Sequence, residues 1–168
     1  RDTPTAAALG TLRVTRALQP MRWSVFDCSY MTPSGYSLQR CKLNLGHQAL
    51  EFRNGSSRLI LEQVYPARLA LTRRNLDDWL RLSSFRDRRV TSSVERKTGT
   101  DGMLVQECVR RLPFPLGGFS SRQNLRLAMH SPGMDRIFLA ENDTRDEPNS
   151  SLLNSCIDGM QWATGGGQ

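Results

Sequence analysis

Lysine, histidine and long apolar runs are all scarce in this sequence of 168 residues. Of its 23 cationic side chains 21 are arginine, and only Lys42 and Lys97 are lysine. No apolar run approaches the roughly 18 to 20 residues that a membrane-spanning helix needs. Aromatic residues make up 7% of the chain and hydrophobic residues 38%. This composition suits one globular domain rather than two domains, a membrane protein or a disordered tail.

Motifs of the common enzyme classes are missing as well. The sequence contains no G-x-S-x-G, H-E-x-x-H, P-loop or G-x-G-x-x-G pattern, so it does not indicate the commonest hydrolases, metalloproteases or nucleotide-binding enzymes. We interpret His47 and His130, in predicted turns or strand ends, as ordinary surface residues. A hydrolase or transferase that combines one of them with carboxylates stays an alternative, because acid–base pairs are assembled in space. The pattern favours a non-catalytic protein without a cofactor.

The cysteines show no metal-binding spacing. None of the four belongs to a C-x-x-C pair, and two histidines are too few to complete a typical site, so no zinc or other metal is expected. An even number of cysteines is compatible with two disulfides in an oxidising compartment, and four reduced thiols in a cytosolic protein are the alternative. The residues concerned are Cys28, Cys41, Cys108 and Cys156.

A predicted hairpin suggests how the cysteines pair. Residues 21–30 and 36–45 read as strands on either side of a Thr-Pro-Ser-Gly turn. A hairpin that is symmetric about this turn places Cys28 opposite Cys41, within the reach of a disulfide. By elimination the other two cysteines form the second bridge, which closes a loop of almost fifty residues and stabilises by about 3–4 kcal/mol.

Two further features point to a location outside the cytosol. The chain begins with Arg1 rather than Met, and we expect a processed or trimmed chain whose targeting segment, if it had one, is gone. Sequons begin at Asn54, Asn142 and Asn149 and are compatible with glycosylation, although polar loops are the simpler explanation. With the predicted disulfides, these features predict an extracytoplasmic protein that is periplasmic, secreted or on the cell surface.

Strand-like segments separated by turns cover most of the chain. Residues 1–10 are small and polar and 164–168 are glycine-rich, so we expect flexible ends on a single domain that spans 11–163. Turn-forming pairs such as Asn54-Gly55 separate successive segments, as they do in hairpins. Strands are predicted at residues 11–17, 22–30, 37–45, 49–53, 58–64, 90–97, 103–111, 124–130 and 136–140.

Two helices interrupt these strands. Asn75 is a good N-cap for a helix that ends near Arg89, with acidic residues in its first turn and arginines in its last. The second helix begins near Asn149 or Ser150 and carries an apolar stripe that includes Cys156. The sequence therefore predicts an α+β fold: a mainly antiparallel, hairpin-rich sheet of about seven to nine strands, with one central and one C-terminal helix.

Hydrophobic patterning assigns faces to some of these strands. Leucine and methionine alternate with other residues over 125–129, which predicts one face on the core and one nearer water. Residues 59–61 are apolar on both faces and are expected to lie centrally. An acidic stretch lacks the glycine and the terminal glutamate of an EF-type loop, so we interpret it as a solvated loop. It contains Glu141, Asp143, Asp146 and Glu147.

One hydrophobic segment can be neither a regular helix nor a central strand. The sequence LPFPLGGF, residues 112–119, places large apolar side chains among two prolines and two glycines. It either plugs the end of the core or presents anchors to a partner or a lipophilic pocket. We predict a partner- or ligand-binding site made of Leu112, Phe114, Leu116 and Phe119, flanked by Arg110, Arg111 and Arg122.

These features favour a non-catalytic binding or structural domain that acts through protein–protein contact. The partner is expected to be another protein, of acidic character, or an anionic amphiphile. Nucleic acid is not favoured, because the arginines are dispersed along the chain rather than concentrated in one run. Two alternatives stay open: a small carrier of a hydrophobic or amphiphilic ligand, gated by the 112–119 loop, and a basic structural subunit of a large assembly.

Overall fold

The computed structural model describes residues 19–25, 27–83, 90–99, 102–111, 123–146 and 149–162. For 81–83, 90–99, 102–111, 123 and 162 it describes the backbone alone. The strands of this part of the chain are β1 (Met21–Val25), β2 (Cys28–Thr32), β3 (Ser37–Asn44), β4 (His47–Asn54), β5 (Ser57–Val64), β6 (Val90–Gly99), β7 (Gly102–Arg111), β8 (Gln123–Ser131), β9 (Arg136–Thr144) and β10 (Gln161–Trp162). The helices are α2 (Ala67–Ala70), α3 (Leu76–Ser83), the 3-10 turn η1 (Pro132–Met134) and α4 (Ser150–Asp158).

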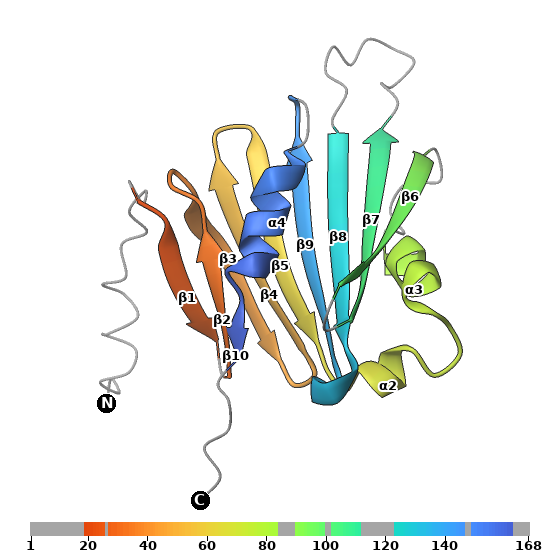
Figure 1. Cartoon of the computed structure of the whole chain (residues 1–168). Coiled ribbons are helices and arrows are strands. Elements are labelled where there is room, and N and C mark those ends of the chain that lie inside the picture. Colours follow the sequence, from red (N-terminus) through yellow and green to blue (C-terminus); the bar gives the residue numbers. More distant parts are fainter. Residues whose placement is uncertain are drawn as a thin grey trace, which may run out of the picture.

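These strands form two antiparallel sheets (Figure 1). The large sheet has seven strands in the order β3-β4-β5-β9-β8-β7-β6, and the small sheet has three in the order β1-β2-β10. Every paired strand is antiparallel. The predicted α+β fold with a mainly antiparallel sheet and a central and a C-terminal helix is therefore confirmed. The predicted strand at 11–17 lies outside the described residues.

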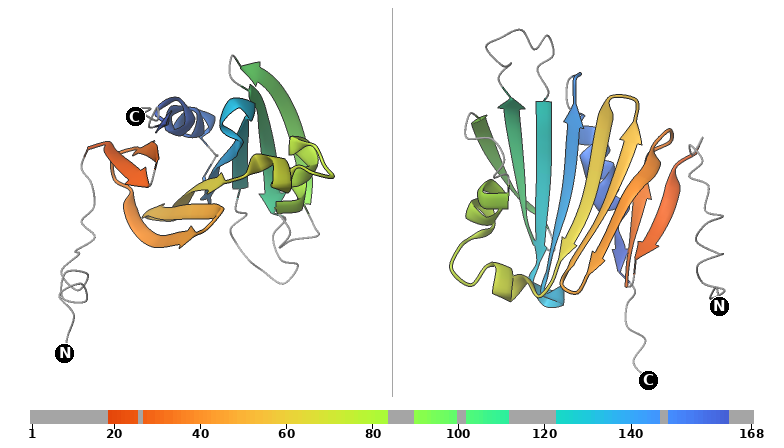
Figure 2. Two further views of the ribbon diagram at one scale, coloured as in Figure 1. Left: turned by 90° about the horizontal axis from the view of Figure 1, so that it is seen from below. Right: turned by 180° about the vertical axis from the view of Figure 1, so that it is seen from behind.

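The two faces of the large sheet are covered by different elements (Figure 2). On the inner face, α4 and the small sheet pack on a core that contains Phe52, Leu61 and Phe138. On the outer face, α2 and α3 pack beside β7, β8 and β9, where Ile137 and Leu139 are buried. The sheet therefore buries apolar residues on both sides at β9 and β8, in agreement with their central position.

Local sequence explains the hairpins of the large sheet. The β4–β5 turn begins with Gly55 at φ +57°, directly after Asn54, as the Asn-Gly pair predicts. In the β3–β4 turn Gly46 has φ +80°, and a Cβ at this position would lie 2.8 Å from the Tyr65 carbonyl oxygen. Only glycine fits this turn without strain. Leu59, Ile60 and Leu61 are buried, which confirms the prediction of a central strand that is apolar on both faces.

Both predicted helix starts are confirmed by their caps. Asn75 Oδ1 accepts a hydrogen bond of 2.8 Å from the Asp78 amide, and Asn149 Oδ1 accepts one of 3.1 Å from the Leu152 amide. Each cap satisfies an amide that would otherwise lack a partner in the first turn. In α4 the predicted apolar stripe is buried and includes Leu153, Cys156 and Ile157.

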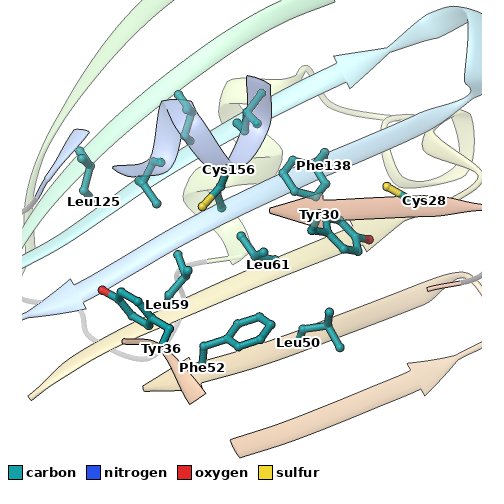
Figure 3. Close-up of a cluster of buried hydrophobic side chains, with 14 residues drawn as sticks. Cys28, Tyr30, Tyr36, Leu50, Phe52, Leu59, Leu61, Leu125, Phe138 and Cys156 are labelled. Atoms are coloured by element: carbon teal, nitrogen blue, oxygen red, sulfur yellow. The ribbon is translucent and has the colours of Figure 1, made fainter. Parts of the chain in front are cut away.

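Aromatic residues join the small sheet to the large one (Figure 3). The Tyr30 ring on β2 stacks on Phe138 of β9, with ring centroids 5.2 Å apart, and its hydroxyl donates a buried hydrogen bond to Gln63 of β5. The Trp23 ring on β1 meets Phe52 of β4 edge to face, also at 5.2 Å. Aromatic pairs of this geometry contribute beyond their buried area. The contact between the sheets therefore depends on a few large rings.

The predicted hairpin between residues 21–30 and 36–45 is wrong. Residues 21–32 form a hairpin of their own, in which Val25 pairs with Cys28, whereas β3 belongs to the other sheet and pairs with β4. The chain thus turns after Val25. In β1 the side chains that face the large sheet are at odd positions, such as Trp23, and in β2 they are at even positions, such as Tyr30.

The two predicted disulfides fail with this hairpin. Cys28 and Cys41 lie on different sheets, and both are free. Cys156 is also free, so it forms no bridge with Cys108, whose side chain lies outside the described part of the structure. Burial raises the pKa of Cys28 and of Cys156 to about 12. Both thiols are therefore protonated near neutral pH.

This difference in burial predicts a site-specific pattern of thiol alkylation. In the native protein at neutral pH, iodoacetamide is expected to modify exposed Cys41 well before Cys28 and Cys156, because alkylation needs an accessible thiolate. Peptide mass mapping after timed quenching measures each site, and a sample unfolded in denaturant serves as the control in which all of them react. Disulfide-linked peptides, or equal rates at the three sites in the native protein, would contradict the prediction.

Candidate functional site

Most of the predicted binding loop lies outside the described residues. Leu112, Phe114, Leu116, Phe119 and Arg122 lie outside the described residues. Arg110 and Arg111 are the last two residues of β7, where their backbones oppose Thr91 and Val90 of β6. The proposed role of this segment in binding a partner or gating a ligand therefore stays a prediction.

The described residues instead bring charged side chains together on the outer face of the large sheet. The strand registers place Arg40, Glu51, Ile60, Glu141 and Arg126 in one row across β3, β4, β5, β9 and β8. Directly opposed residues point to the same face of a sheet, so these charges share one surface. Hydrogen bonds along and beside this row form two groups, one that joins Arg58 to Glu51 and one that joins Asn124 and Arg126 to Glu141. We call these five residues together the ionic ladder.

One end of the ionic ladder lies under α3. Arg126 is only 5% exposed, and its Nε donates a 3.0 Å hydrogen bond to Glu141 Oε2. Its Nη1 donates a 2.9 Å bond to the backbone oxygen of Leu80 in α3. The second oxygen of Glu141 accepts a 2.7 Å bond from Asn124 Nδ2. The guanidinium thus fixes the helix to the sheet through two polar contacts.

The other end of the ionic ladder is partly open to solvent. Arg58 forms a bidentate pair with Glu51, with Nε–Oε1 and Nη2–Oε2 distances of 2.8 and 3.0 Å. This hydrogen-bonded pairing lowers the pKa of Glu51 below its ordinary value, and the positive charges of Arg58, Arg53 and Arg40 act in the same direction. The same pairing raises the pKa of Arg58. Both side chains therefore keep their charges well into acid.

Glu51 is expected to make part of the stability dependent on pH. Because its pKa is lower in the folded than in the unfolded chain, it stabilises the fold above about pH 4.5, its ordinary value, and the contribution is lost as the pH falls through the lowered pKa. Glu51→Gln should therefore destabilise the protein more at pH 7 than at pH 3, as measured by urea unfolding. In an Arg58→Gln background the same substitution should show much less of this pH dependence, and an equal dependence in both backgrounds would contradict the assignment.

Exposed charges beside the ionic ladder are all positive. On β3, β4 and β5, which the structure describes in full, the exposed charged residues are Arg40, Lys42 and Arg53. The two carboxylates of these strands, Glu51 and Glu62, are half-buried, and each lies within 3.0 Å of a basic partner. The surface of these strands that faces solvent therefore carries three exposed cations, of which Arg53 also lies 3.9 Å from Glu51.

The histidines take up different positions on the same face. His47 Nε2 lies 3.0 Å from Glu62 Oε2, and His130 is half-buried on β8 opposite Ile137.

In the part of the chain that the structure describes, no three His, Cys, Asp or Glu side chains are grouped as a metal ion would require. None of the described helices is both long and apolar enough to cross a membrane.

The interpretation of the acidic stretch as a solvated loop is wrong for its first half. Glu141 and Asp143 belong to β9, which continues to Thr144, and Asp143 is buried. The prediction that alternate residues of 125–129 face water is also wrong, because α3 covers Arg126 and Ala128. The β8–β9 turn, made of η1 and Asp135, sets the register in which Arg126 and Glu141 are directly opposed. The Pro-Gly pair in this turn is the sequence signal from which this opposition could have been predicted.

Comparison with known proteins detects a likeness of fold only. No protein-family model matches the chain, and no curated protein matches its sequence. Among solved structures, the chain is similar to the Saccharomyces cerevisiae Ran-binding protein Mog1p, with a TM-score of 0.58, 8% identity and coverage of 88% of this chain and 97% of that one. A mutant of protein Mog1 matches with the same TM-score and identity, over 86% of this chain and 96% of the other.

The predicted extracytoplasmic location is wrong. It depended mainly on disulfides, and Cys28, Cys41 and Cys156 are free. A solved structure that shares the fold, Mog1p, is a Ran-binding protein. The sequon at Asn142 does not support the prediction either, because Asn142 is only 2% exposed and its amide donates to Ser57 and Arg58. A glycan cannot be attached to an asparagine buried in this way.

Proposed function

We propose that this chain is a protein-binding domain whose partner docks on the outer side of β3, β4 and β5. One observation carries the proposal: the charged side chains exposed there are all cations, while both carboxylates are half-buried in pairs. Arg40, Lys42 and Arg53 are thus available to acidic groups of a partner, and arginine binds carboxylates in a bidentate manner. The partner is accordingly a protein with an acidic surface or segment.

Two further observations support this proposal. The fold is shared with the Ran-binding protein Mog1p, so at least one protein of this architecture binds another protein. The helices of the outer face contact β7, β8 and β9, and the outward side chains of β3 and the end of β4 stay open to solvent. We place the protein inside the cell, because free thiols are the usual state in reducing compartments.

Charge reversal tests the proposed surface. The tagged protein is recovered from its own cells, the co-purified proteins are identified by mass spectrometry, and the affinity of a candidate partner is then measured with purified components. Arg40→Glu/Arg53→Glu is expected to weaken binding of the partner about tenfold or more. Added salt should also weaken binding of the partner by the wild-type protein, because it screens the same charges. Urea unfolding verifies that the variant is folded.

A matched control distinguishes this surface from overall charge. Arg73→Glu/Arg74→Glu changes the net charge equally, at exposed positions between α2 and α3. This control should bind the partner like the wild-type protein. Equal loss in both variants would show that only net charge matters, and full binding by Arg40→Glu/Arg53→Glu would place the partner elsewhere; either result overturns the proposal.

A further inference from the structure

Strand β3 is an edge of the large sheet. Within the part of the chain that the structure describes, its backbone pairs with β4 alone, along a register from Ser37–Arg53 to Asn44–His47. In an antiparallel ladder every second residue directs its N–H and C=O groups away from the paired strand. An edge strand therefore presents a row of backbone groups that can pair with another chain.

The side chains of β3 alternate between two chemical types. Arg40 and Lys42 point to the outer face, and Cys41 and Leu43 point to the inner face, because their partners across β4 are Glu51, Ala49, Leu50 and Gln48 respectively. All four are exposed, and Leu43 is 50% exposed although it is a large apolar residue. Leu45, which follows in the turn, is 95% exposed. Cationic and apolar side chains therefore alternate along this edge from Arg40 to Leu43.

This alternation argues against pairing between two copies of β3. When two identical strands pair with matching faces, residues of the outer face oppose one another, so that Arg40 and Lys42 of one copy meet the same cations of the other. Like charges directly opposed on a sheet are destabilising. Edge cations are a common means by which proteins prevent self-association. The same cations favour a strand that carries carboxylates at these positions.

We infer that β3 receives an extended acidic segment of the partner as an added strand. Backbone hydrogen bonds to the free edge supply the pairing, and alternate side chains supply the selectivity. Carboxylates of the segment lie against Arg40 and Lys42, and apolar side chains lie against Cys41 and Leu43. This inference rests on the proposed function and specifies how the partner reaches the same surface.

A synthetic peptide as long as β3, with alternating glutamate and valine, tests the inference. It is expected to bind the full chain in fluorescence anisotropy, and a peptide of alternating lysine and valine should not. On binding, hydrogen exchange should slow at amides of residues 39–45, and alkylation of Cys41 should slow as well. A glutamate–valine peptide N-methylated on alternate amides should bind much more weakly, because it cannot complete the backbone pairing.

A charge swap keeps the test independent of folding. Lys42→Glu is expected to weaken binding of the glutamate peptide about tenfold and to strengthen that of the lysine peptide, because the cross-strand charge pair at position 42 changes from attractive to repulsive for the first peptide and the reverse for the second. Arg73→Glu, remote from the edge in sequence and equal in charge change, should leave both affinities unchanged. A variant that gains affinity for one peptide as it loses the other is not simply unfolded.

Three results would overturn the inference. If the peptide binds but the amides of residues 39–45 are not protected from exchange, strand addition is excluded. If both peptides bind with equal affinity, selectivity for acidic segments is excluded. If the protein forms a dimer in which the same amides are protected, the β3 edge binds a second copy of this chain instead. The proposed function is judged separately. If the glutamate peptide fails to bind but Arg40→Glu/Arg53→Glu still loses the native partner, the docking face stands and the added strand does not.

Discussion

Arg126→Ala is expected to lower the free energy of unfolding by about 3–5 kcal/mol, because it removes one partner from a buried ion pair. Glu141 would be left with only Asn124 as a described hydrogen-bond partner, and the Leu80 carbonyl would lose its guanidinium donor. Both groups lie where α3 covers the sheet, so water replaces the lost bonds poorly. Urea denaturation at neutral pH measures the effect.

Two comparisons isolate the cause of this loss. Arg53→Ala removes a side chain that is 60% exposed, 3.9 Å from Glu51, and should change stability by less than about 0.5 kcal/mol. Arg126→Met/Glu141→Leu removes both charges and should recover much of the loss, since no uncompensated charge remains. If Arg126→Ala lowered the free energy of unfolding as little as Arg53→Ala does, the Arg126–Glu141 pair would contribute no more to stability than a surface ion pair, which would contradict the prediction.

Phe52→Ala is expected to destabilise the protein by about 3–5 kcal/mol, the usual range for a buried phenylalanine. Phe52 is fully buried between the sheets and packs edge to face with the Trp23 ring. Its removal leaves a cavity and also releases Trp23, whose indole N–H donates to Thr32. The emission of this tryptophan should therefore shift toward that of a solvated indole before global unfolding.

Leu45→Ala is the matched control for this prediction. Leu45 is a large apolar residue in the β3–β4 turn, and its almost complete exposure means that truncation should change stability by less than about 0.5 kcal/mol. A similar loss in both variants would show that the chemical change, rather than burial, determines the effect. A loss below about 1 kcal/mol for Phe52→Ala would contradict the described packing of the two sheets.

Sequence predicts those parts of this fold that depend on local chemistry. The caps Asn75 and Asn149 act on neighbouring amides, and Gly55 adopts a backbone conformation that few other residues tolerate. The turn after Val25 contains no glycine or proline, so the sequence on both sides of it looks like that of one continuous strand. Its local signal is Asp27, a residue type that is common in turns. A second signal is that the inward-facing positions change from odd, such as Trp23, to even, such as Tyr30, and this change can be seen only when the inner face is known.

The charged surface was missed for a related reason. A charged residue on a strand is ordinarily assigned to water, and only the position of α3 decides that Arg126 is buried. Likewise, exposure of Arg40 and Lys42 depends on β3 being an edge, which is a property of strand order across the whole sheet. Neither helix placement nor strand order is encoded in the neighbours of these residues. The predicted disulfides are wrong for the same reason, because a Cys28–Cys41 bridge requires β2 and β3 to form one hairpin, and these strands belong to different sheets.

The small sheet is assembled from segments far apart in the chain. β2 pairs with β10, and the Arg22 guanidinium donates a 2.6 Å hydrogen bond to the Gln161 side chain. During synthesis, β1 and β2 leave the ribosome long before α4 and β10 that complete their packing. The inner core around Phe138 therefore lacks its C-terminal cover until the last described elements emerge, and a chaperone that shields apolar surface would act in this interval.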